Sequence, residues 1–312
     1  MAAASGAILI RVDQSGLGDY TKIQDAIDSV PSNNSELVFI WIKPGTYREK
    51  VVVPADKPFI TLSGTNAADS TVITWNDGGN APSQSPTVKI LASDFVGRYL
   101  TIQNTYGKTG KGVALKVSGD KAAFYGCRIL SYQDTLLDDI GRHYYKNCYI
   151  EGATDFVFGN AASLYEKCHL HSISKGDGAM TAQKRESPLE NTGFVFLGCK
   201  LTGSGGAVLG RPWGSYSRVV YAITYMSDVV QPQGWNDWED PTKQKTAYYG
   251  EYKCYGPGSK RDKRVKWSHS LSNEEAAPFL AKTMIGGRGW LRPAPTQFRK
   301  NSPIVKMKPN EN

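Results

Sequence analysis

The sequence predicts an all-β protein: a right-handed parallel β-helix with short capping helices, forming a single domain over residues 1–312. Residues 126–129 and 147–150 repeat one pattern at an offset of 21 residues. At the same offset Asp134 aligns with Asp155. Each copy has a short alternating apolar run followed by polar or glycine residues, which is typical of a strand and a turn. Units this short cannot bury an apolar face alone, so the repeat indicates a solenoid.

Cysteines recur in the same pattern. Cys148, Cys168 and Cys199 follow Cys127 at successive spacings of 21, 20 and 31 residues, and Cys254 is the fifth cysteine of the chain. Disulfide bonds are one interpretation, but an odd count leaves at least one thiol unpaired. In the four repeated copies an aliphatic residue stands two places after the cysteine, which suits a strand interior. We therefore expect an inward-facing column, and leave the pairing of the five open.

The composition limits the possible partners. The 312 residues carry a net charge of +8, which favours a polyanion such as nucleic acid, anionic lipid or an acidic polysaccharide. No basic stripe with interleaved aromatic residues occurs, so we expect no nucleic-acid partner. No run approaches the roughly 18 apolar residues of a membrane helix, so we expect no membrane partner.

The remaining elements follow in chain order. A helix over about 21–30, with Thr21 and Gln24 as a capping box, is predicted to cover the N-terminal end of the coil. Apolar runs predict strands, and a polar loop follows them; these segments are 37–42, 51–53, 60–62 and 71–74, with the loop at 77–85. A second helix starts at Ser272 with Glu275 completing its capping box, inside a predicted C-terminal cover over about 240–312.

Several familiar kinds of site are absent from the sequence. It contains no GxSxG, GxxxxGK[ST] or GxGxxG pattern. The four histidines form no ligand cluster, and we interpret His169 and His171 as surface residues of a strand rather than as zinc ligands. Chemistry based on a pair of acids remains.

Asp134 and Asp155 are the candidate pair. Neighbouring strands lie about 4.8 Å apart, so their carboxyl groups are expected within roughly 4 to 6 Å if both point outward. At such a distance one acid tends to hold its proton while the other stays charged, which supplies a general acid beside a nucleophile or base. Two solvated surface acids are the alternative. The neighbours Gln133, Phe156 and Phe158 are amide or aromatic rather than charged, which favours a site.

At these residues the sequence resembles the plant pectin methylesterases, carbohydrate esterase family 8. The matching stretches fall in the order of that family, between about residues 10 and 291; they are 45–49 (GTYRE), 132–136 (YQDTL), 155–161 (DFVFGNA) and 209–213 (LGRPW). The resemblance implies a parallel β-helix, methyl-esterified homogalacturonan as substrate, and neither a metal nor another cofactor.

The resemblance also implies roles for four residues. Asp155 would be the nucleophile on the C6 methyl-ester carbonyl, and Asp134 would protonate the departing methanol and then act as base toward water. Gln133 would donate to the oxyanion, and Arg211 would hold the Asp155 carboxylate ionised and oriented. A purely structural ion pair is the alternative for Arg211.

Five further residues are expected to contact the substrate. Trp213 and Trp235 would pack against sugar rings and Phe158 would line the cleft, although core filling is the alternative for the tryptophans. Thr46, in the first matching stretch, and Lys111 complete the predicted substrate contacts.

Three positions depart from the family pattern. Lys111 replaces a glutamine that helps hold the oxyanion, and it supplies a flexible ammonium in place of an aimed amide. Leu137 stands where an aromatic residue is frequent, and Lys184 replaces a common glycine. Because of Lys111, one alternative to an esterase is a non-catalytic or weakly active pectin-binding β-helix. A β-helix glycosidase or lyase on the same polymer is a separate alternative.

The resemblance carries expectations about the protein's surroundings. We expect a secreted, monomeric glycoprotein of the plant cell wall, with a proteinaceous pectin methylesterase inhibitor as a possible partner. The opening residues MAAASGAILI lack the basic start of a signal peptide, so the signal is expected to lie outside this sequence. A glycosylation sequon at 33–35 (NNS) fits secretion.

Overall fold

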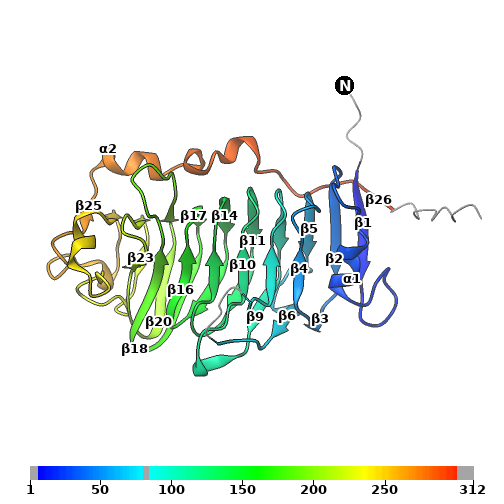
Figure 1. The fold of residues 1–312 in the computed structure, drawn as a ribbon, viewed down its shortest axis with the longest axis horizontal. Coiled ribbons are helices and arrows are strands. Elements are labelled where there is room, and N and C mark those ends of the chain that lie inside the picture. Colours follow the sequence, from blue (N-terminus) through cyan, green and yellow to red (C-terminus); the bar gives the residue numbers. More distant parts are fainter. Residues whose placement is uncertain (1–5, 80–83, 301–312) are drawn as a thin grey trace, which may run out of the picture.

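The chain winds as a parallel β-helix whose coils stack along one long axis (Figure 1). The computed structural model describes residues 6–79 and 84–300. Within those ranges the paired strands are parallel, and most strands pair with one strand of the coil before and one strand of the coil after. The predicted fold class is confirmed, because nearly all regular structure is strand and helices are few.

One sheet of twelve strands forms the first face of the coil. Its strands are β1 (Ala7–Val12), β2 (Val38–Ile42), β5 (Ile60–Ser63), β8 (Val96–Arg98), β11 (Ala122–Tyr125), β14 (Arg142–Lys146), β17 (Ala162–Glu166), β19 (Gly193–Leu197), β22 (Arg218–Ala222), β24 (Tyr248–Tyr252), β25 (His269–Ser270) and β26 (Phe298–Lys300).

A second sheet of fourteen strands forms the other two faces, which are joined because the 15-residue strand β18 belongs to both. Its strands are β3 (Gly45–Arg48), β4 (Val51–Val53), β6 (Thr71–Trp75), β7 (Val88–Ile90), β9 (Thr101–Asn104), β10 (Leu115–Val117), β12 (Arg128–Leu130), β13 (Leu136–Asp138), β15 (Tyr149–Gly152), β16 (Thr154–Gly159), β18 (His169–Gln183), β20 (Lys200–Val208), β21 (Arg211–Pro212) and β23 (Tyr225–Met226).

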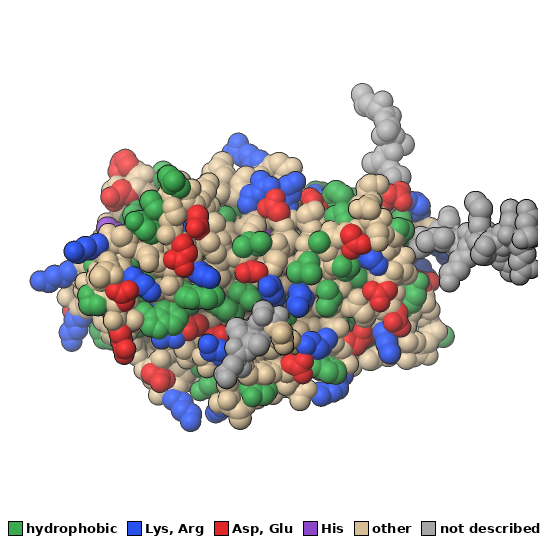
Figure 2. Space-filling model, viewed as in Figure 1, with side chains coloured by type: hydrophobic (Ala, Val, Ile, Leu, Met, Phe, Trp, Pro, Cys, Tyr) green, Lys and Arg blue, Asp and Glu red, His purple; other side chains and the backbone are tan. Residues whose placement is uncertain are grey.

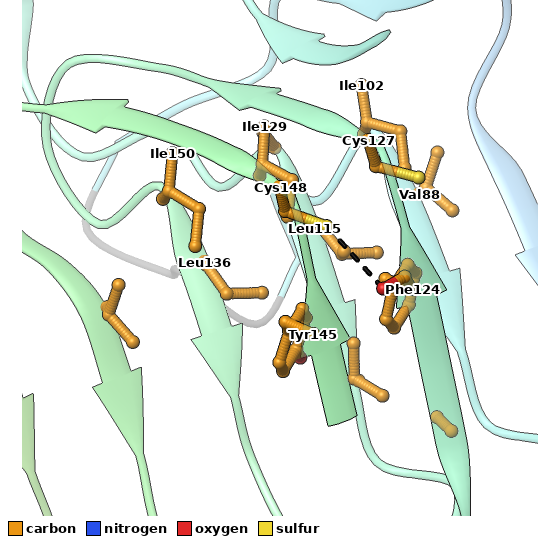
Figure 3. Packing of buried hydrophobic residues seen from close by; sticks show 14 of the residues in the cluster. Val88, Ile102, Leu115, Phe124, Cys127, Ile129, Leu136, Tyr145, Cys148 and Ile150 are labelled. Carbon is orange, nitrogen blue, oxygen red and sulfur yellow. Dashed lines mark hydrogen bonds between the residues drawn. The ribbon is translucent and has the colours of Figure 1, made fainter. Parts of the chain in front are cut away.

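The cysteines form the expected inward column, and none is in a disulfide. Each follows a corner residue in the left-handed region, with φ between 47° and 63°; these residues are Gly126, Asn147, Lys167, Gly198 and Lys253. Thiols donate to a carbonyl of the preceding coil over 3.2 to 3.6 Å, as Cys148 does to Phe124 (Figure 3). In the coil between Cys199 and Cys254, Thr224 takes the column position and donates to Phe196, which explains why the sequence repeat lapses there.

Aromatic rings stack inside the coil beside this column. Centroids of successive rings lie 4.2 to 5.9 Å apart, within the range for favourable aromatic pairs. The ladder runs through Phe124, Tyr145, Tyr165, Phe196, Tyr221, Trp235 and Tyr249. Trp235 is therefore a core residue, which contradicts its predicted contact with sugar.

A buried carboxylate, that of Asp138, lies at the end of β13. The Asp138 carboxylate, fully buried, accepts from His143 Nδ1 at 2.5 Å and from the hydroxyls of Tyr145 and Tyr165 at 2.8 and 2.6 Å. His143 Nε2 donates to the carbonyl of Gly119 over 2.9 Å. Both ring nitrogens thus lie within hydrogen-bond distance of an oxygen acceptor. Burial alone would raise the Asp138 pKa, but His143 and the hydrogen bonds hold it below its usual value.

The first helix, α1 (Ile23–Asp28), packs its apolar residues against β1, β2 and β4 at the N-terminal end of the coil. Its predicted capping box is wrong. The helix begins after Lys22, and the Glu49 carboxylate, from a distant strand end, accepts the free N–H groups of Ile23 and Gln24 at 3.0 and 3.1 Å. Gln24 instead bonds to Asp28 and to β4.

The C-terminal segment takes a different path from the predicted cover. The helix α2 (Asn273–Ala276) has the predicted capping box between Ser272 and Glu275. From there the chain runs back along the outside of the twelve-stranded sheet and pairs β26 with β1 (Figure 1). Its buried residues Phe279 and Ile285 share a cluster with side chains on the outer face of that sheet, so the segment covers a face rather than an end.

Short 3₁₀ turns connect the remaining elements: η1 (Ala68–Ser70), η2 (Gly107–Thr109), η3 (Pro241–Lys245), η4 (Pro257–Ser259), η5 (Ala277–Phe279), η6 (Lys282–Ile285) and η7 (Gly287–Gly289). The predicted strands at 37–42, 51–53, 60–62 and 71–74 are confirmed, with shifts of one residue at their ends. Of the predicted loop at 77–85, residues 80–83 lie outside the described ranges. The same holds for residues 301–312 of the predicted C-terminal cover.

Candidate active site

Seven of the nine predicted site residues line one cleft of about 200 Å³ on the fourteen-stranded sheet, and two do not. Its lining consists of Lys111, Gln133, Asp134, Asp155, Phe158, Ala182, Arg211, Trp213 and Trp238. A larger pocket of about 500 Å³, between Phe39, Trp41 and Phe298, has no acid in its lining. The paired acids therefore locate the candidate chemistry in the smaller cleft.

Asp134 and Asp155 occupy equivalent places on adjacent coils. Gln133 bridges Thr154 in parallel, and the backbone N–H of Asp134 donates to the Thr154 carbonyl over 3.1 Å. The strands that follow stay in this register, with Leu136 opposite Val157. The 21-residue offset in the sequence is therefore one turn of the coil, and it lays one acid beside the other.

Both acids have a left-handed backbone, with φ of 61° at Asp134 and 49° at Asp155. Such a conformation costs an L-residue on the order of 1 kcal/mol, although aspartate tolerates it better than most. At Asp155 it coincides with a register shift between β16 and β18. The bend re-aims the side chain, which is a common use of a strand irregularity beside a site.

Arg211 holds Asp155 through both of its oxygens. Nε donates to Oδ1 over 2.8 Å and Nη2 donates to Oδ2 over 2.6 Å, a two-point geometry that fixes the carboxylate plane. Arg211 lies on β21, which pairs with β18. In the order of strands, β16 separates β18 from β13. The Asp155 side chain is only 9% exposed, so the ion pair is largely shielded from water.

No basic side chain within residues 6–79 and 84–300 forms an ion pair with Asp134. Burial raises its pKa, the negative charge of Asp155 raises it further, and Lys111 and Arg211 lower it in part, leaving it at about 7. Below pH 7 a protonated Asp134 therefore lies in the same cleft as the Asp155–Arg211 ion pair. That combination can supply a proton donor and a nucleophile to the same bond.

Lys111 lies on the coil before Asp134, and Gln133 lies next to Asp134 on the same coil. They bridge each other in parallel, so the order along the coil axis is Lys111, then Gln133 with Asp134, then Asp155. Lys111 is exposed and Gln133 is half-buried. Both residues line the cleft together with the two acids.

Aromatic and apolar side chains form one wall of the cleft. Phe158 and Trp213 meet at a tilt with centroids 6.0 Å apart, and Trp213 is 39% exposed. Leu137, at one of the positions that depart from the family pattern, shares a buried cluster with Phe158 and Ala182. A leucine rather than an aromatic residue at position 137 therefore forms the base of this wall.

Trp238 is a site residue that the sequence did not single out. Its ring lies on the guanidinium of Arg211, 3.9 Å from carbon to centroid, and it lines the cleft. The backbone at Trp238 and Glu239 is left-handed, with N–H groups held by Asn236 and Asp237. The repeated tryptophan in residues 234–238 (GWNDW) was the available signal, and the structure places the second one, half-buried, in the cleft.

Trp235 and Thr46 lie elsewhere. Trp235 is 1% exposed between Tyr221 and Tyr249 in the aromatic ladder, and its indole donates to buried Glu251 at 3.3 Å, so it cannot touch a sugar. Thr46 lies on β3, an outermost strand of the sheet, and does not line the cleft. The stretch at 45–49 that resembles the family therefore belongs to a strand of the coil, and its Thr46 is not a residue of the cleft.

The described residues offer no metal site. No group of three His, Cys, Asp or Glu side chains within 6–79 and 84–300 could hold an ion. His169 and His171 both bond to the Thr202 hydroxyl, at 2.6 and 2.7 Å, as partly buried residues of the strand surface. Over the same ranges no helix has the length and apolar character to cross a membrane.

Comparison with known proteins gives one consistent result. The pectinesterase family model matches residues 9–288. "Putative pectinesterase 11" of Arabidopsis thaliana is 65% identical over 96% of this chain and 85% of its own length, and "Pectinesterase 31" of the same plant is 41% identical over 91% and 95%.

Solved structures agree with the sequence relatives. The pectin methylesterase from carrot superposes with a TM-score of 0.87 at 34% identity, covering 93% of this chain and 96% of the carrot chain. The enzyme from Aspergillus niger gives a TM-score of 0.80 at 30% identity over 93% and 96%. The chain therefore belongs to the pectinesterase family, and it is an enzyme, a pectin methylesterase.

Proposed function

We propose that this protein hydrolyses the C6 methyl esters of homogalacturonan with Asp155 as nucleophile and Asp134 as general acid and base. The observation that carries the proposal is the pair of acids on adjacent coils of one cleft. Asp155 is ion-paired at both oxygens to Arg211, and Asp134 has a pKa of about 7. The surroundings of the two acids differ, which supports different roles for them.

The reaction takes two steps. In the first, a carboxylate oxygen of Asp155 attacks C6, the bond from C6 to the methoxy oxygen breaks, and Asp134 gives its proton to that oxygen, so methanol leaves. In the second, Asp134 removes a proton from water, whose oxygen attacks C6 of the mixed anhydride. The bond to Asp155 breaks, which restores its carboxylate and releases the galacturonate acid.

Gln133 and Lys111 serve the oxyanion in this scheme. Negative charge develops on the carbonyl oxygen of C6 in both steps, and donors placed beforehand stabilise it. Gln133 lines the cleft beside Asp134 and would supply an amide donor, whereas Lys111 adds charge from a flexible chain. Trp238 keeps the guanidinium of Arg211 in the plane that Asp155 needs.

A glycosidase is the second candidate on this fold. Inverting glycosidases need carboxyl groups about 6.5 to 9.5 Å apart, with water between them. Adjacent coils are separated by about 4.8 Å, and Arg211 occupies the oxygens of one acid. The arrangement suits direct attack on an ester better than attack by an intervening water.

Highly methyl-esterified pectin distinguishes these functions. We expect methanol to appear in step with new carboxylate groups while the polymer length stays constant. Shortened chains would support a hydrolase or lyase instead. Binding without methanol release would support the pectin-binding alternative, in which the site has lost activity at Lys111.

The activity is expected to fall at alkaline pH. Asp134 must carry its proton in the first step, and because its pKa is raised to about 7 the proton is present below that pH and lost above it. We expect kcat/KM to drop about tenfold per pH unit above roughly pH 7. The measurement is methanol release from a soluble esterified oligosaccharide; a rate that rises steadily through this range would contradict the assignment.

Lys111→Gln is expected to raise the rate by roughly three- to tenfold, because an aimed amide replaces a flexible ammonium at the oxyanion. The variant should also shift the alkaline limb upward, since the charge of Lys111 lowers the pKa of Asp134. Lys108→Gln, which removes a charge near Tyr132 outside the cleft, is the matched control. An unchanged or lower rate in Lys111→Gln would refute this interpretation of the substitution.

We further propose that the protein acts as a secreted monomer in the cell wall, where its polymeric substrate is found. The exposed Asn33 of the sequon supports secretion, because its side chain is accessible for glycosylation. Charges of both signs are interspersed on the face in Figure 2, which agrees with a polysaccharide rather than a nucleic-acid partner.

A further inference from the structure

We propose that the pocket of about 500 Å³ on the twelve-stranded sheet is a second binding site, which takes an acidic sugar of de-esterified pectin away from the candidate active site. Arg98 would bind the carboxylate of the sugar, and Trp41 would pack against its ring. The inference goes beyond the proposed function. It uses the family to which the chain belongs, and none of its steps depends on the roles of the two aspartates.

The pocket lies on the outer face of the first coils, beside the returning C-terminal segment (Figure 1). Its lining comes from β1, β2, β5 and β8 and the turns that follow them, while Ala294 and Phe298 belong to the C-terminal segment. It shares no lining residue with the cleft of Asp134 and Asp155, which lies on the fourteen-stranded sheet. A ligand in this pocket would therefore not occupy the candidate active site.

Trp41, Ser63 and Arg98 form one row across three neighbouring strands. Trp41 pairs with Ser63, and Ser63 pairs with Arg98. The residues on either side of Trp41, Ile40 and Ile42, are buried in the core, so the row faces outward, because alternate residues of a strand face the same way. The strand spacing puts the Cα atoms of Trp41 and Arg98 about 10 Å apart. This separation lets one oligosaccharide contact both side chains.

The guanidinium of Arg98 has no acceptor within residues 6–79 and 84–300. No ion pair of the described residues involves it, and its Nε is buried without a hydrogen-bond partner. It lies over the ring of Tyr125, 4.3 Å from carbon to centroid, which positions the group and leaves its N–H donors free. The planar fork of arginine matches a carboxylate, and the pocket lining contains no Asp or Glu. An external carboxylate therefore fits this group.

Aromatic rings and polar side chains share the rest of the lining. Phe39 lies on β2 with Trp41, and Phe298, 45% exposed, meets Phe39 edge to face with centroids 5.1 Å apart. Thr65 and Asn66 add a hydroxyl and an amide to the same pocket. A sugar has an apolar face and a rim of hydroxyls, so it suits rings beside hydrogen-bonding groups. The hydrocarbon chain of a fatty acid would leave those polar groups without partners.

Charge complementarity selects an acidic polymer as the occupant. The chain has a net charge of +8, and the ammonium of Lys43 lies 4.6 Å from the centroid of the Trp41 ring, which adds a second cation next to the pocket. De-esterification by a pectin methylesterase leaves galacturonate carboxylates, so the ligand is present where the enzyme works. Binding at this pocket would hold the enzyme on the polymer, which raises the effective concentration of substrate without changing the chemical step.

The first test modifies the unaltered enzyme with phenylglyoxal and follows the labelling of Arg98 by mass spectrometry. The ligand is trigalacturonate, and its fully methyl-esterified form and octanoate are the comparisons. We expect saturating trigalacturonate to slow the labelling at least about tenfold, as for a hydrogen bond between charged groups, and the ester to leave it unchanged. No protection, equal protection by the ester, or stronger protection by octanoate would overturn the proposal.

Arg98→Gln and Arg128→Gln form a matched pair for the second test. Arg128 also lies over a tyrosine ring, 5.6 Å from the centroid of Tyr149, but it lines neither the pocket nor the cleft, so both variants lose one charge. Affinity electrophoresis in gels that contain polygalacturonate measures the Kd. We expect it to rise at least about tenfold in Arg98→Gln and to stay unchanged in Arg128→Gln. Equal values in the two variants would overturn the proposal.

Methanol release separates this site from the proposed function. On a short esterified oligosaccharide, kcat/KM should be the same in Arg98→Gln, Arg128→Gln and the unaltered enzyme. A fall in Arg98→Gln alone, with unchanged affinity for polygalacturonate, would overturn the proposal of a separate site. If the unaltered enzyme released no methanol, the proposed function would fail, and the labelling of Arg98 would still decide whether this pocket binds the acidic sugar.

Discussion

Asp155→Asn is expected to abolish methanol release, with a fall in kcat of at least about 10⁴-fold, as for removal of other catalytic nucleophiles. The amide has nearly the shape of the carboxylate but cannot form the anhydride. The assay is methanol release from esterified pectin, combined with circular dichroism and thermal unfolding to establish that the coil is intact.

Asp177→Asn is the matched control, because Asp177 is an exposed aspartate outside the cleft. It should leave turnover unchanged. If Asp155→Asn retained turnover within tenfold of the unaltered enzyme, Asp155 could not be the nucleophile. In that case its pair with Arg211 would be structural.

Asp138→Ala is expected to be the most destabilising of the substitutions considered, lowering the free energy of unfolding by about 3 to 5 kcal/mol. The change leaves the buried His143 ring without its carboxylate partner and removes the acceptor of two tyrosine hydroxyls. Urea unfolding measures the loss. Asp120→Ala breaks a half-exposed pair with Arg142 and should cost only about 0 to 1 kcal/mol.

The same variant should change the acid sensitivity of the fold. The pKa of Asp138 is lowered in the folded chain, so its stabilisation is present above the unfolded pKa and is lost as the pH falls toward the folded one. Asp138→Ala should therefore flatten the loss of stability below about pH 4. Equal stability losses in Asp138→Ala and Asp120→Ala would contradict the importance of burial here.

The sequence predicted the coil because its repeat has a direct physical cause. Each turn needs a sharp corner and an inward residue behind it, and Gly126-Cys127 and Asn147-Cys148 supply both. The same repeat predicted the acid pair, since one turn of the coil separates Asp134 from Asp155. A pattern that repeats in the sequence must repeat in space.

Features outside the repeat were harder to predict from the sequence. Trp235 and Trp238 stand three residues apart, and only the ladder of stacked rings shows which of them is enclosed. The cap of α1 comes from Glu49, whose approach depends on the stacking of distant strands. The return of the C-terminal segment along a sheet face likewise depends on apolar residues of many coils, which no local pattern brings together.

The central claim is that one acid of the pair stays protonated near neutral pH. Infrared difference spectra during a pH titration measure this directly, because a protonated carboxyl has its own C=O band. We expect a band that persists at pH 6, disappears with a midpoint near pH 7 and is missing from Asp134→Asn. A band lost by about pH 5, where ordinary carboxyls have already ionised, or one that remains in Asp134→Asn, would contradict the account.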